Sequence, residues 1–264
     1  MNAVTTTPTK QGQLYLVPAP LDFGCDSHAP LTDVLPELTL RTAAGLTHWV
    51  SENAKSCRAY LKRIDALFPL AAPLQAQQIQ ELPREAHKKG DHGGKGSAQF
   101  DAKALLAPAL AGHDMGLISE AGMPAVADPG SSIVRAAHDL GLSVIPLVGP
   151  VSLLLTLAAS GLNGQNFAFV GYLPQDASAR TQRIKELESL ALRQGQSQQF
   201  IETPYRNAAL WQALLQTLQP GTRLAVASGL TLATASIQSR SAKQWKSLPC
   251  PVDNRTPAVF VLGA

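Results

Sequence analysis

Short apolar runs alternate with helical stretches through the first part of the chain. The apolar runs predict strands at 13–20, 47–53, 115–122 and 142–149. Helical spacing of apolar residues predicts helices at 57–68, 102–112, 128–141 and 151–161. Ser131 or Ser132 can cap the third of these helices, and Gly141 can end it. This alternation predicts a parallel sheet covered on both faces.

The pattern changes after residue 166. The later segments predict strands at 167–174, 199–204, 223–230 and 257–264, and helices at 181–194 and 208–218. These strands lie closer together in sequence, which is typical of a mixed sheet with hairpins. Trp211 and Trp245 are expected in the core or at an interface, not as platforms for base stacking.

The composition is that of a globular protein, with 45% apolar and 16% charged residues. A net charge of +3 is too mild to indicate a nucleic-acid partner and does not exclude one. The three cysteines are irregularly spaced, so we expect no disulfide framework and no zinc site, and we expect Cys57 to be a packed thiol. The N-terminus has no apolar run, and prolines and glycines interrupt the apolar run 144–162. We therefore expect a cytoplasmic, soluble protein without a membrane span.

The stretch SEAGMPAVADPG (119–130) breaks the chain repeatedly just after a predicted strand. Ligands of open α/β sheets bind beyond the carboxyl ends of the strands. Gly122 permits a positive φ and close approach of a ligand, and Pro124 fixes the turn that follows. The stretch is therefore either a binding loop or a plain connection between strand and helix.

Two further segments allow a structural and a functional interpretation. The basic, glycine-rich stretch 87–97 fails the spacing of a phosphate-binding loop. It is expected to be a solvated loop that could contact RNA phosphates through lysines. In ETPYRN (202–207), Thr203 and Pro204 can start a helix, while Tyr205 and Arg206 can contact cofactor or substrate.

Several motifs agree in order and spacing with one family: SEAGMPAVADPG, IPLVGPVS, GYLP and IETPYR. Together they resemble the tetrapyrrole-methylase-like superfamily of S-adenosylmethionine-dependent methyltransferases. Within it, the chain resembles the branch of ribosomal RNA small subunit methyltransferase I, and most closely a shorter, less characterised subgroup of that branch. The resemblance covers residues 12–264 and is densest over 115–207.

The resemblance implies a tetrapyrrole methylase fold of two α/β domains. Domain 12–148 would hold the parallel sheet and domain 149–264 the mixed sheet, with S-adenosyl-L-methionine in the cleft between them and two copies forming a homodimer. No metal is implied, because the methyl group of a sulfonium is already activated. The residues implied to bind the cofactor are Pro18, Glu120, Ala121, Gly122, Pro124, Val126, Val151, Ser152, Tyr172 and Leu173. We expect Gly122→Val to block cofactor binding and to leave the fold intact.

If the acceptor is a hydroxyl group, a general base can help to remove its proton. The candidate catalytic residues are Glu52, Glu120 and Asp128, with Glu202 as a further carboxylate. Glu120 can instead hydrogen-bond the turn or the cofactor, and Asp128 can cap a helix that begins at Pro129.

The candidate substrate contacts are Lys55, Tyr205 and Arg206. The ribosomal enzymes carry the motif A-E-D-T-R where this chain has SENAKSCR, so Asn53 replaces an acid. The chain also has PAPLDF (18–23) where that branch has P-T-P-I-G-N. Both loops should face the substrate, so these departures leave open which methyl acceptor the chain uses.

The leading hypothesis is methylation of a ribose 2′-hydroxyl in small-subunit ribosomal RNA, by resemblance. One alternative is a methyltransferase with another acceptor, such as a tetrapyrrole-like metabolite or a protein side chain. A second is a cofactor-binding regulatory module without catalysis, which the altered SENAK segment suggests.

Overall fold

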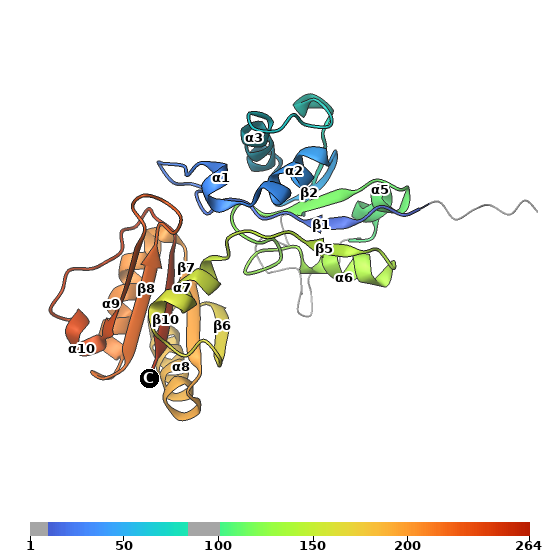
Figure 1. Cartoon of the computed structure of the whole chain (residues 1–264). Coiled ribbons are helices and arrows are strands. Elements are labelled where there is room, and N and C mark those ends of the chain that lie inside the picture. The colour runs from blue at the N-terminus through green and yellow to red at the C-terminus, as the bar shows by residue number, and fades with distance from the viewer. Residues whose placement is uncertain (1–9, 84–100) are drawn as a thin grey trace, which may run out of the picture. The chain divides into compact units, whose positions relative to one another are not determined.

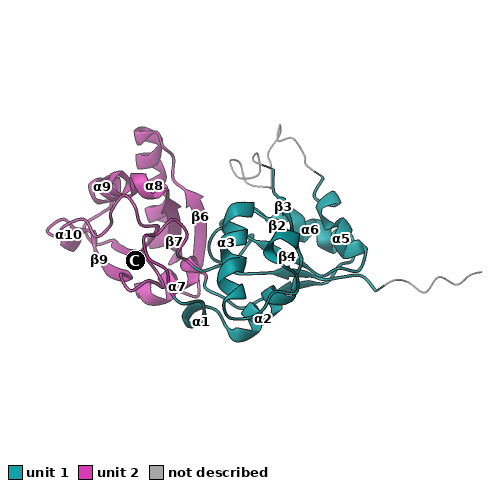
Figure 2. Cartoon of the chain, turned by 90° about the horizontal axis from the view of Figure 1, so that it is seen from above, with its two compact units in different colours: residues 1–20, 30–150 teal, residues 21–29, 151–264 magenta. Residues whose placement is uncertain are grey.

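The computed structural model describes residues 10–83 and 101–264. The basic stretch 87–97 lies outside the described residues. Figure 2 shows two compact units: unit 1 comprises residues 1–20 and 30–150, and unit 2 comprises residues 21–29 and 151–264. The segment 21–29 thus groups with unit 2, although the predicted domain ranges are contiguous.

Sheet 1, in unit 1, has five strands in the order β3-β2-β4-β1-β5. Their bounds are β1 (Leu14–Leu16), β2 (His48–Ser51), β3 (Gln78–Glu81), β4 (Met115–Ile118) and β5 (Val144–Pro146). Every pairing between neighbours is parallel. The carboxyl ends of the strands therefore share one edge, where ligands of such sheets bind.

Helices cover both faces of sheet 1, as Figure 1 shows for α2 and α3 on one side and α6 on the other. The helical segments among the described residues of unit 1 are α1 (Leu31–Val34), α2 (Glu37–Gly45), α3 (Ala54–Asp65), η1 (Leu74–Ala76), η2 (Ala104–Leu106), α5 (Ala107–Leu110) and α6 (Ser131–Asp139). Trp49 of β2 is fully buried against Gly116 of β4, where any side chain would overlap the indole ring. A glycine in this strand is thus explained by close packing.

Two details of the predicted helices are wrong. The expected helix 102–112 is divided into η2 and α5, with Pro108 in the first turn of α5. Neither Ser131 nor Ser132 is the N-cap of α6, because Gly130 takes that position with a φ of +136°. Glycine adopts this backbone conformation readily, whereas a serine would be strained.

Sheet 2, in unit 2, has five strands in the order β6-β7-β10-β8-β9. Their bounds are β6 (Phe167–Tyr172), β7 (Ser197–Glu202), β8 (Arg223–Ser228), β9 (Ser236–Ser241) and β10 (Ala258–Gly263). The β6–β7 pair is parallel and the other pairs are antiparallel, so the sheet is mixed. The expected combination of a parallel sheet with a mixed sheet is confirmed.

The helices of unit 2 are α7 (Ser152–Ser160), α8 (Ala177–Gln194), η3 (Pro204–Arg206), α9 (Asn207–Thr217) and α10 (Ala242–Trp245). Both views show α8 and α9 on one face of sheet 2 and α7 on the other. The main core lies on the first face and includes Trp211 and Trp245, which meet edge to face. The expectation that these tryptophans are core residues is confirmed.

A β-bulge interrupts β6 next to its carboxyl end. Phe169 pairs with Gln199 and Tyr172 with Ile201, so β6 holds one residue more than β7 in this interval, and Gly171 has a φ of +72°. Side chains alternate between the faces of a strand, so one extra residue reverses their direction. Tyr172 consequently stays on the surface, and the next side chain enters the core.

Within the described ranges, no helix is both long enough and apolar enough to span a membrane.

Candidate functional site

The turns after β1 and β4 are hydrogen-bonded to each other at the carboxyl edge of sheet 1. The Gly122 amide donates to the Ala19 carbonyl at 3.0 Å, and the Ala19 amide donates to the Gly122 carbonyl at 2.9 Å. Both turns follow strands that are neighbours in the sheet. The segments VPAP (17–20) and SEAGMP (119–124), which the sequence predicts to border one site, are therefore brought together.

Contacts from α2, α3 and the turn after β5 fix the same edge. Gly149 lies so close to Pro18 that a Cβ on Gly149 would overlap the proline ring. The buried Tyr60 hydroxyl donates to the Pro18 carbonyl at 3.2 Å, and the buried Thr39 hydroxyl donates to the Val148 carbonyl at 2.8 Å. These bonds restrict the turns to one conformation before any ligand arrives, and such preorganisation favours binding.

The loop between β4 and α6 holds several residues in the left-handed region of backbone conformation. The φ angles are +69° at Gly122, +64° at Ala125, +65° at Ala127 and +136° at Gly130. The two glycines adopt such angles readily, but each alanine is destabilised by roughly 1–2 kcal/mol. Strained residues that persist in a folded protein cluster at ligand sites and active sites.

Three carboxylates predicted as catalytic candidates meet at this edge. The Glu120 amide donates to Glu52 Oε2 at 3.3 Å. The pKa of Asp128 is raised to about 7, chiefly by burial and in addition by the nearby Glu52 and Glu120 carboxylates. Asp128 therefore exchanges a proton near neutral pH, which is the range a general base requires.

Two expectations about this loop are wrong. Gly122 has a φ of +69° and its backbone is paired with Ala19, so Gly122→Val would strain the fold instead of leaving it intact. Asp128 does not cap a helix beginning at Pro129, because α6 begins at Ser131 with Gly130 as its N-cap.

The altered SENAK segment has a clear structural role. The Asn53 side chain is the N-cap of α3, and its Oδ1 accepts from the amides of Lys55 at 2.9 Å and Ser56 at 3.4 Å. Glu81, at the end of β3, accepts from the Ala54 amide at 2.7 Å. Sequence analysis missed Glu81, because the short polar strand QIQE gave no strong signal. The Lys55 side chain is exposed, where it could meet a substrate.

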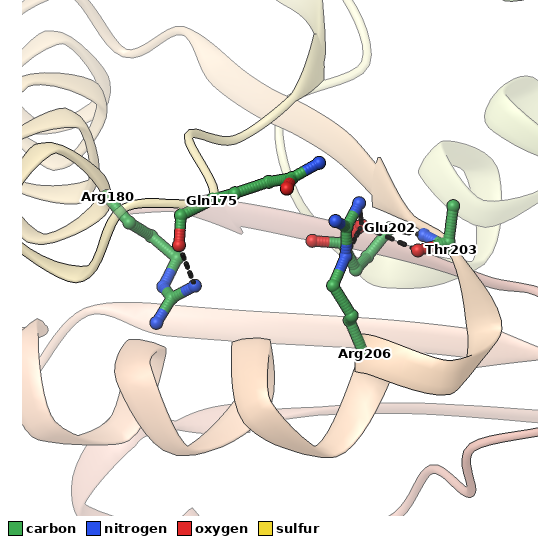
Figure 3. Close-up of polar contacts among 5 residues, drawn as sticks. All are labelled: Gln175, Arg180, Glu202, Thr203 and Arg206. Atoms are coloured by element: carbon green, nitrogen blue, oxygen red, sulfur yellow. Dashed lines mark hydrogen bonds and ion pairs between the residues drawn. The ribbon is translucent and has the colours of Figure 1, made fainter.

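A second set of predicted residues lies at the end of β7 in unit 2. The buried Glu202 Oε1 accepts from the Thr203 amide at 2.7 Å and the Thr203 hydroxyl at 3.1 Å. It also accepts from Arg206 Nε at 2.9 Å and Nη2 at 2.6 Å. Figure 3 shows this pair beside the loop that follows β6. These four bonds to one oxygen of Glu202 hold Arg206 in place and tie the turn to the end of β7.

The Tyr205 side chain is presented to solvent from the short turn η3. It is 66% exposed, and the Arg206 guanidinium lies 5.2 Å from the centre of its ring. Pro204 begins the turn and the Arg206 amide donates to the Thr203 carbonyl at 2.9 Å, so the turn is well fixed. The structural interpretation of ETPYRN is confirmed, because the segment starts a helix, and a contact of Tyr205 and Arg206 with cofactor or substrate stays a prediction.

The remaining predicted cofactor contacts are distributed between the two units. Pro18, Glu120, Ala121, Gly122, Pro124 and Val126 belong to unit 1, whereas Val151, Ser152, Tyr172 and Leu173 belong to unit 2. The Leu173 side chain is buried in the core of unit 2, which leaves its backbone for ligand contact. Val126 and Tyr172 are exposed by 41% and 56%. Their roles stay predictions.

Cys57 is a packed thiol, as expected. It is buried, and that burial raises the pKa of the Cys57 thiol to about 12. Among residues 10–83 and 101–264, no group of three or more His, Cys, Asp and Glu side chains is arranged to hold a metal ion.

Comparison with known proteins bears out the resemblance seen in the motifs. No protein-family model matches the chain. The "Ribosomal RNA small subunit methyltransferase I" of Vibrio cholerae is 30% identical over 164 residues, which cover 62% of this chain and 56% of the relative. The protein of the same name from Bacillus subtilis is 30% identical over 207 residues, which cover 78% of this chain and 60% of the relative. The chain thus spans a little over half the length of these curated relatives.

A solved structure confirms the fold. The crystal structure of the methyltransferase CobJ has a TM-score of 0.55 to this chain at 17% sequence identity, over 96% of this chain and 94% of that chain. The chain therefore has the expected tetrapyrrole methylase fold, and it is related in sequence to the proteins named ribosomal RNA small subunit methyltransferase I.

Proposed function

We propose that the chain is an S-adenosylmethionine-dependent methyltransferase whose acceptor is a hydroxyl of small-subunit ribosomal RNA, a ribose 2′-hydroxyl by resemblance. The carboxylates Glu52, Glu120 and Asp128, gathered on preorganised turns at the carboxyl edge of sheet 1, carry this proposal. The names of the curated relatives support methyl transfer and small-subunit ribosomal RNA as its substrate.

The edge of sheet 1 suits the cofactor chemically. S-adenosylmethionine carries a positive sulfonium and an ammonium group, both of which are favoured near carboxylates. The turn at Ala121 and Gly122, together with Pro18, would supply backbone groups and small side chains beside it. When bound, the cofactor supplies an activated methyl group, so the protein needs to bind, orient and exclude water. Contributions from Val151, Ser152, Tyr172 and Leu173 are part of this proposal.

Asp128 is the residue we assign to proton removal. Its pKa of about 7 leaves an appreciable fraction ionised at neutral pH, and its carboxylate is then basic enough to accept a proton from an acceptor hydroxyl. Glu52 contributes by accepting the Glu120 amide and by adding negative charge. Glu52 and Glu120 thus act on Asp128 electrostatically in this scheme.

The partners follow from the acceptor. A ribosomal RNA substrate would place the enzyme in the cytoplasm, as expected from the sequence. A homodimer is supported by the outer side of α7, where Leu154 and Leu155 are exposed by 52% and 41%. An apolar helix face of this kind favours burial against another protein surface, which we assign to a second copy. Sedimentation of Leu154→Glu, compared with the unaltered protein, tests this assignment.

The first experiment is calorimetric titration with S-adenosylmethionine and with S-adenosylhomocysteine. We expect binding of both, and absence of binding to either would overturn the proposal. Methyl transfer is then measured with labelled cofactor and small-subunit ribosomal RNA from cells that lack this gene.

The catalytic assignment is tested by Asp128→Asn. We expect the single-turnover rate to fall on the order of 10²- to 10⁴-fold, with cofactor affinity changed only a few-fold. Asp139→Asn is the matched control, because Asp139 is an exposed carboxylate at the far end of α6. A rate for Asp128→Asn equal to that of the control would remove Asp128 from the reaction. In the unaltered protein, the rate should rise with pH through about 7.

A further inference from the structure

We propose that the Tyr205–Arg206 turn of unit 2, flanked by Arg180 and Arg255, is a binding platform for single-stranded RNA. A base would stack on the Tyr205 ring while backbone phosphates lie near the guanidinium groups. The choice of RNA rests on the proposed function, whereas the platform itself follows from the side chains described below.

Sheet topology gathers these residues at one edge. β6 and β7 are parallel neighbours, and Ala258 at the start of β10 pairs with Glu202 at the end of β7. The loop after β6, the turn after β7 and the loop before β10 therefore meet at the same edge of sheet 2. Arg206 lies in the turn after β7 and Arg255 in the loop before β10, and Arg180 lies near the start of α8, which follows the loop after β6.

The loop before β10 is bonded directly to the start of α9. The Asn207 side chain donates to the Asp253 carbonyl at 3.1 Å and to the Thr256 carbonyl at 2.9 Å. The Ala208 amide donates to Asn254 Oδ1 at 3.0 Å. The exposed Arg255 is thus held next to the Tyr205–Arg206 turn.

The acids at this edge are turned toward the protein backbone. Asp176 accepts from the Ala179 amide at 2.8 Å as the N-cap of α8. Asp253 accepts from the amides of Arg255 and Thr256 at 2.8 and 2.7 Å, and these bonds hold its pKa below the usual range. These bonds fix both carboxylates against backbone amides, while the guanidinium groups keep N–H donors for a ligand.

Arg206 and Arg180 each have N–H donors that are available to an anionic ligand. Arg206 uses Nε and Nη2 for Glu202, so its Nη1 hydrogens are not needed for that pair. Arg180 Nη1 donates to the Gln175 carbonyl at 3.3 Å, while its buried Nε has no hydrogen-bond partner within the described part of the chain. Figure 3 shows both guanidiniums beside the Gln175 loop. A buried donor without a partner is unfavourable, and an anionic oxygen would satisfy it.

The exposed ring of Tyr205 is suited to stack against an unpaired base. Its ring is 66% exposed on a turn that is fixed from within by Glu202. Proteins bind unpaired bases on exposed aromatic rings, often beside arginine, because every base has a face that can stack. A duplex hides those faces, so this arrangement selects single strands.

The test measures binding of a fluorescein-labelled, mixed-sequence RNA 12-mer by fluorescence anisotropy over a series of salt concentrations. We expect Tyr205→Leu to weaken binding about 5- to 150-fold, the equivalent of one lost stacking contact, and Tyr205→Phe to stay close to the unaltered protein. Arg180→Gln should lower the slope of log K against log salt by about 0.7, the value for one phosphate contact on a single strand. The slope for Tyr205→Leu should not change.

Arg223→Gln is the matched control, because Arg223 is an exposed arginine at the start of β8, on the opposite edge of sheet 2. Equal losses in Arg223→Gln and Arg180→Gln would show general charge attraction and overturn the platform. Duplex RNA bound as tightly as the single strand would also overturn it, as would equal affinity of the Leu and Phe variants at Tyr205. Thermal melting of each variant verifies that it is folded.

Cofactor calorimetry on the same variants separates the two proposals. RNA binding without cofactor binding would support the RNA-binding platform and overturn the proposed methyl transfer. Cofactor binding without RNA binding at 50 mM salt, on the other hand, would overturn the platform and leave the methyltransferase intact.

Discussion

The carboxylates at the carboxyl edges of the two sheets have opposite electrostatic surroundings. In unit 2, Glu202 is buried but receives hydrogen bonds from Thr203 and Arg206. In unit 1, Asp128 lies near Glu52 and Glu120, and its pKa is raised to about 7. The compensated carboxylate is part of the scaffold, whereas the uncompensated one holds a proton that can be exchanged at neutral pH. Similar strand ends therefore support a fixed scaffold contact in one unit and the proposed proton transfer in the other.

The largest effect should come from breaking the compensated pair. Arg206→Met leaves the Glu202 carboxylate buried without its counter-charge, and we expect the free energy of unfolding to fall by about 2–4 kcal/mol. The control is Arg183→Met, which removes the partner of Glu186 from an exposed pair and should change stability by less than about 0.5 kcal/mol. Urea unfolding followed by circular dichroism measures both. Equal effects in the two variants would mean that Glu202 is not held by Arg206.

The turns of unit 1 can be disturbed without touching a charge. In Gly149→Ala the new methyl group overlaps Pro18, so we expect a loss of about 1–3 kcal/mol in unfolding free energy and weaker cofactor binding. Gly164→Ala serves as the control, because a Cβ there meets open space. Denaturation and calorimetry on both variants check this, and a neutral Gly149→Ala would show that the contact with Pro18 yields easily.

Neutralising the uncompensated carboxylate should stabilise the protein. The pKa of Asp128 is raised from 3.8 to about 7, so in this interval the folded state binds more protons than the unfolded state. The free energy of unfolding of the unaltered protein therefore falls as pH rises through this interval. Asparagine resembles the protonated acid, and we expect Asp128→Asn to be more stable by about 1–2 kcal/mol at pH 8 and equal at pH 4. Melting curves of both proteins at pH 4 and pH 8 test this prediction. A lower stability of Asp128→Asn than of the unaltered protein at pH 8 would contradict it.

The smallest effect should come from relieving backbone strain beside Asp128. Ala127 has a φ of +65°, and Ala127→Gly should raise the free energy of unfolding by about 1 kcal/mol. Ala121→Gly is the matched change in the same loop, at a residue whose φ is not positive, and should be slightly destabilising. Chemical denaturation compares the two, and a loss of stability in both would mean that the alanine is not strained.

Sequence analysis predicted best which candidate residues lie together when these residues follow strands of one parallel sheet. Glu52 and Glu120 follow neighbouring strands, so a parallel sheet had to bring them to one edge. The supports of that edge were not predictable, because the bonds from Tyr60 and Thr39 join segments far apart in sequence. Alanine also has no preference that would reveal a positive φ at Ala125.

The fold was predicted least well where elements are short and polar. The strand β3 (Gln78–Glu81) carries glutamines and a glutamate, and it exists because it pairs with β2. The helices α1 and α2 begin after prolines and have no capping side chain, so their starts gave a weak signal. Pairing and packing decide such segments, and local sequence carries little information about either.

The segment 21–29 is separated in the sequence from the rest of its unit by residues 30–150 of unit 1. It groups with unit 2 and contains a contact between His28 Nδ1 and Asp22 Oδ2 at 3.4 Å, although it precedes most of unit 1 in the chain. On the ribosome this segment emerges before residues 30–150 of unit 1, and residues 151–264 of its own unit emerge after them. Unit 2 can therefore be assembled only after unit 1 has emerged, and cleavage at Pro150 would release no fragment that contains all of unit 2.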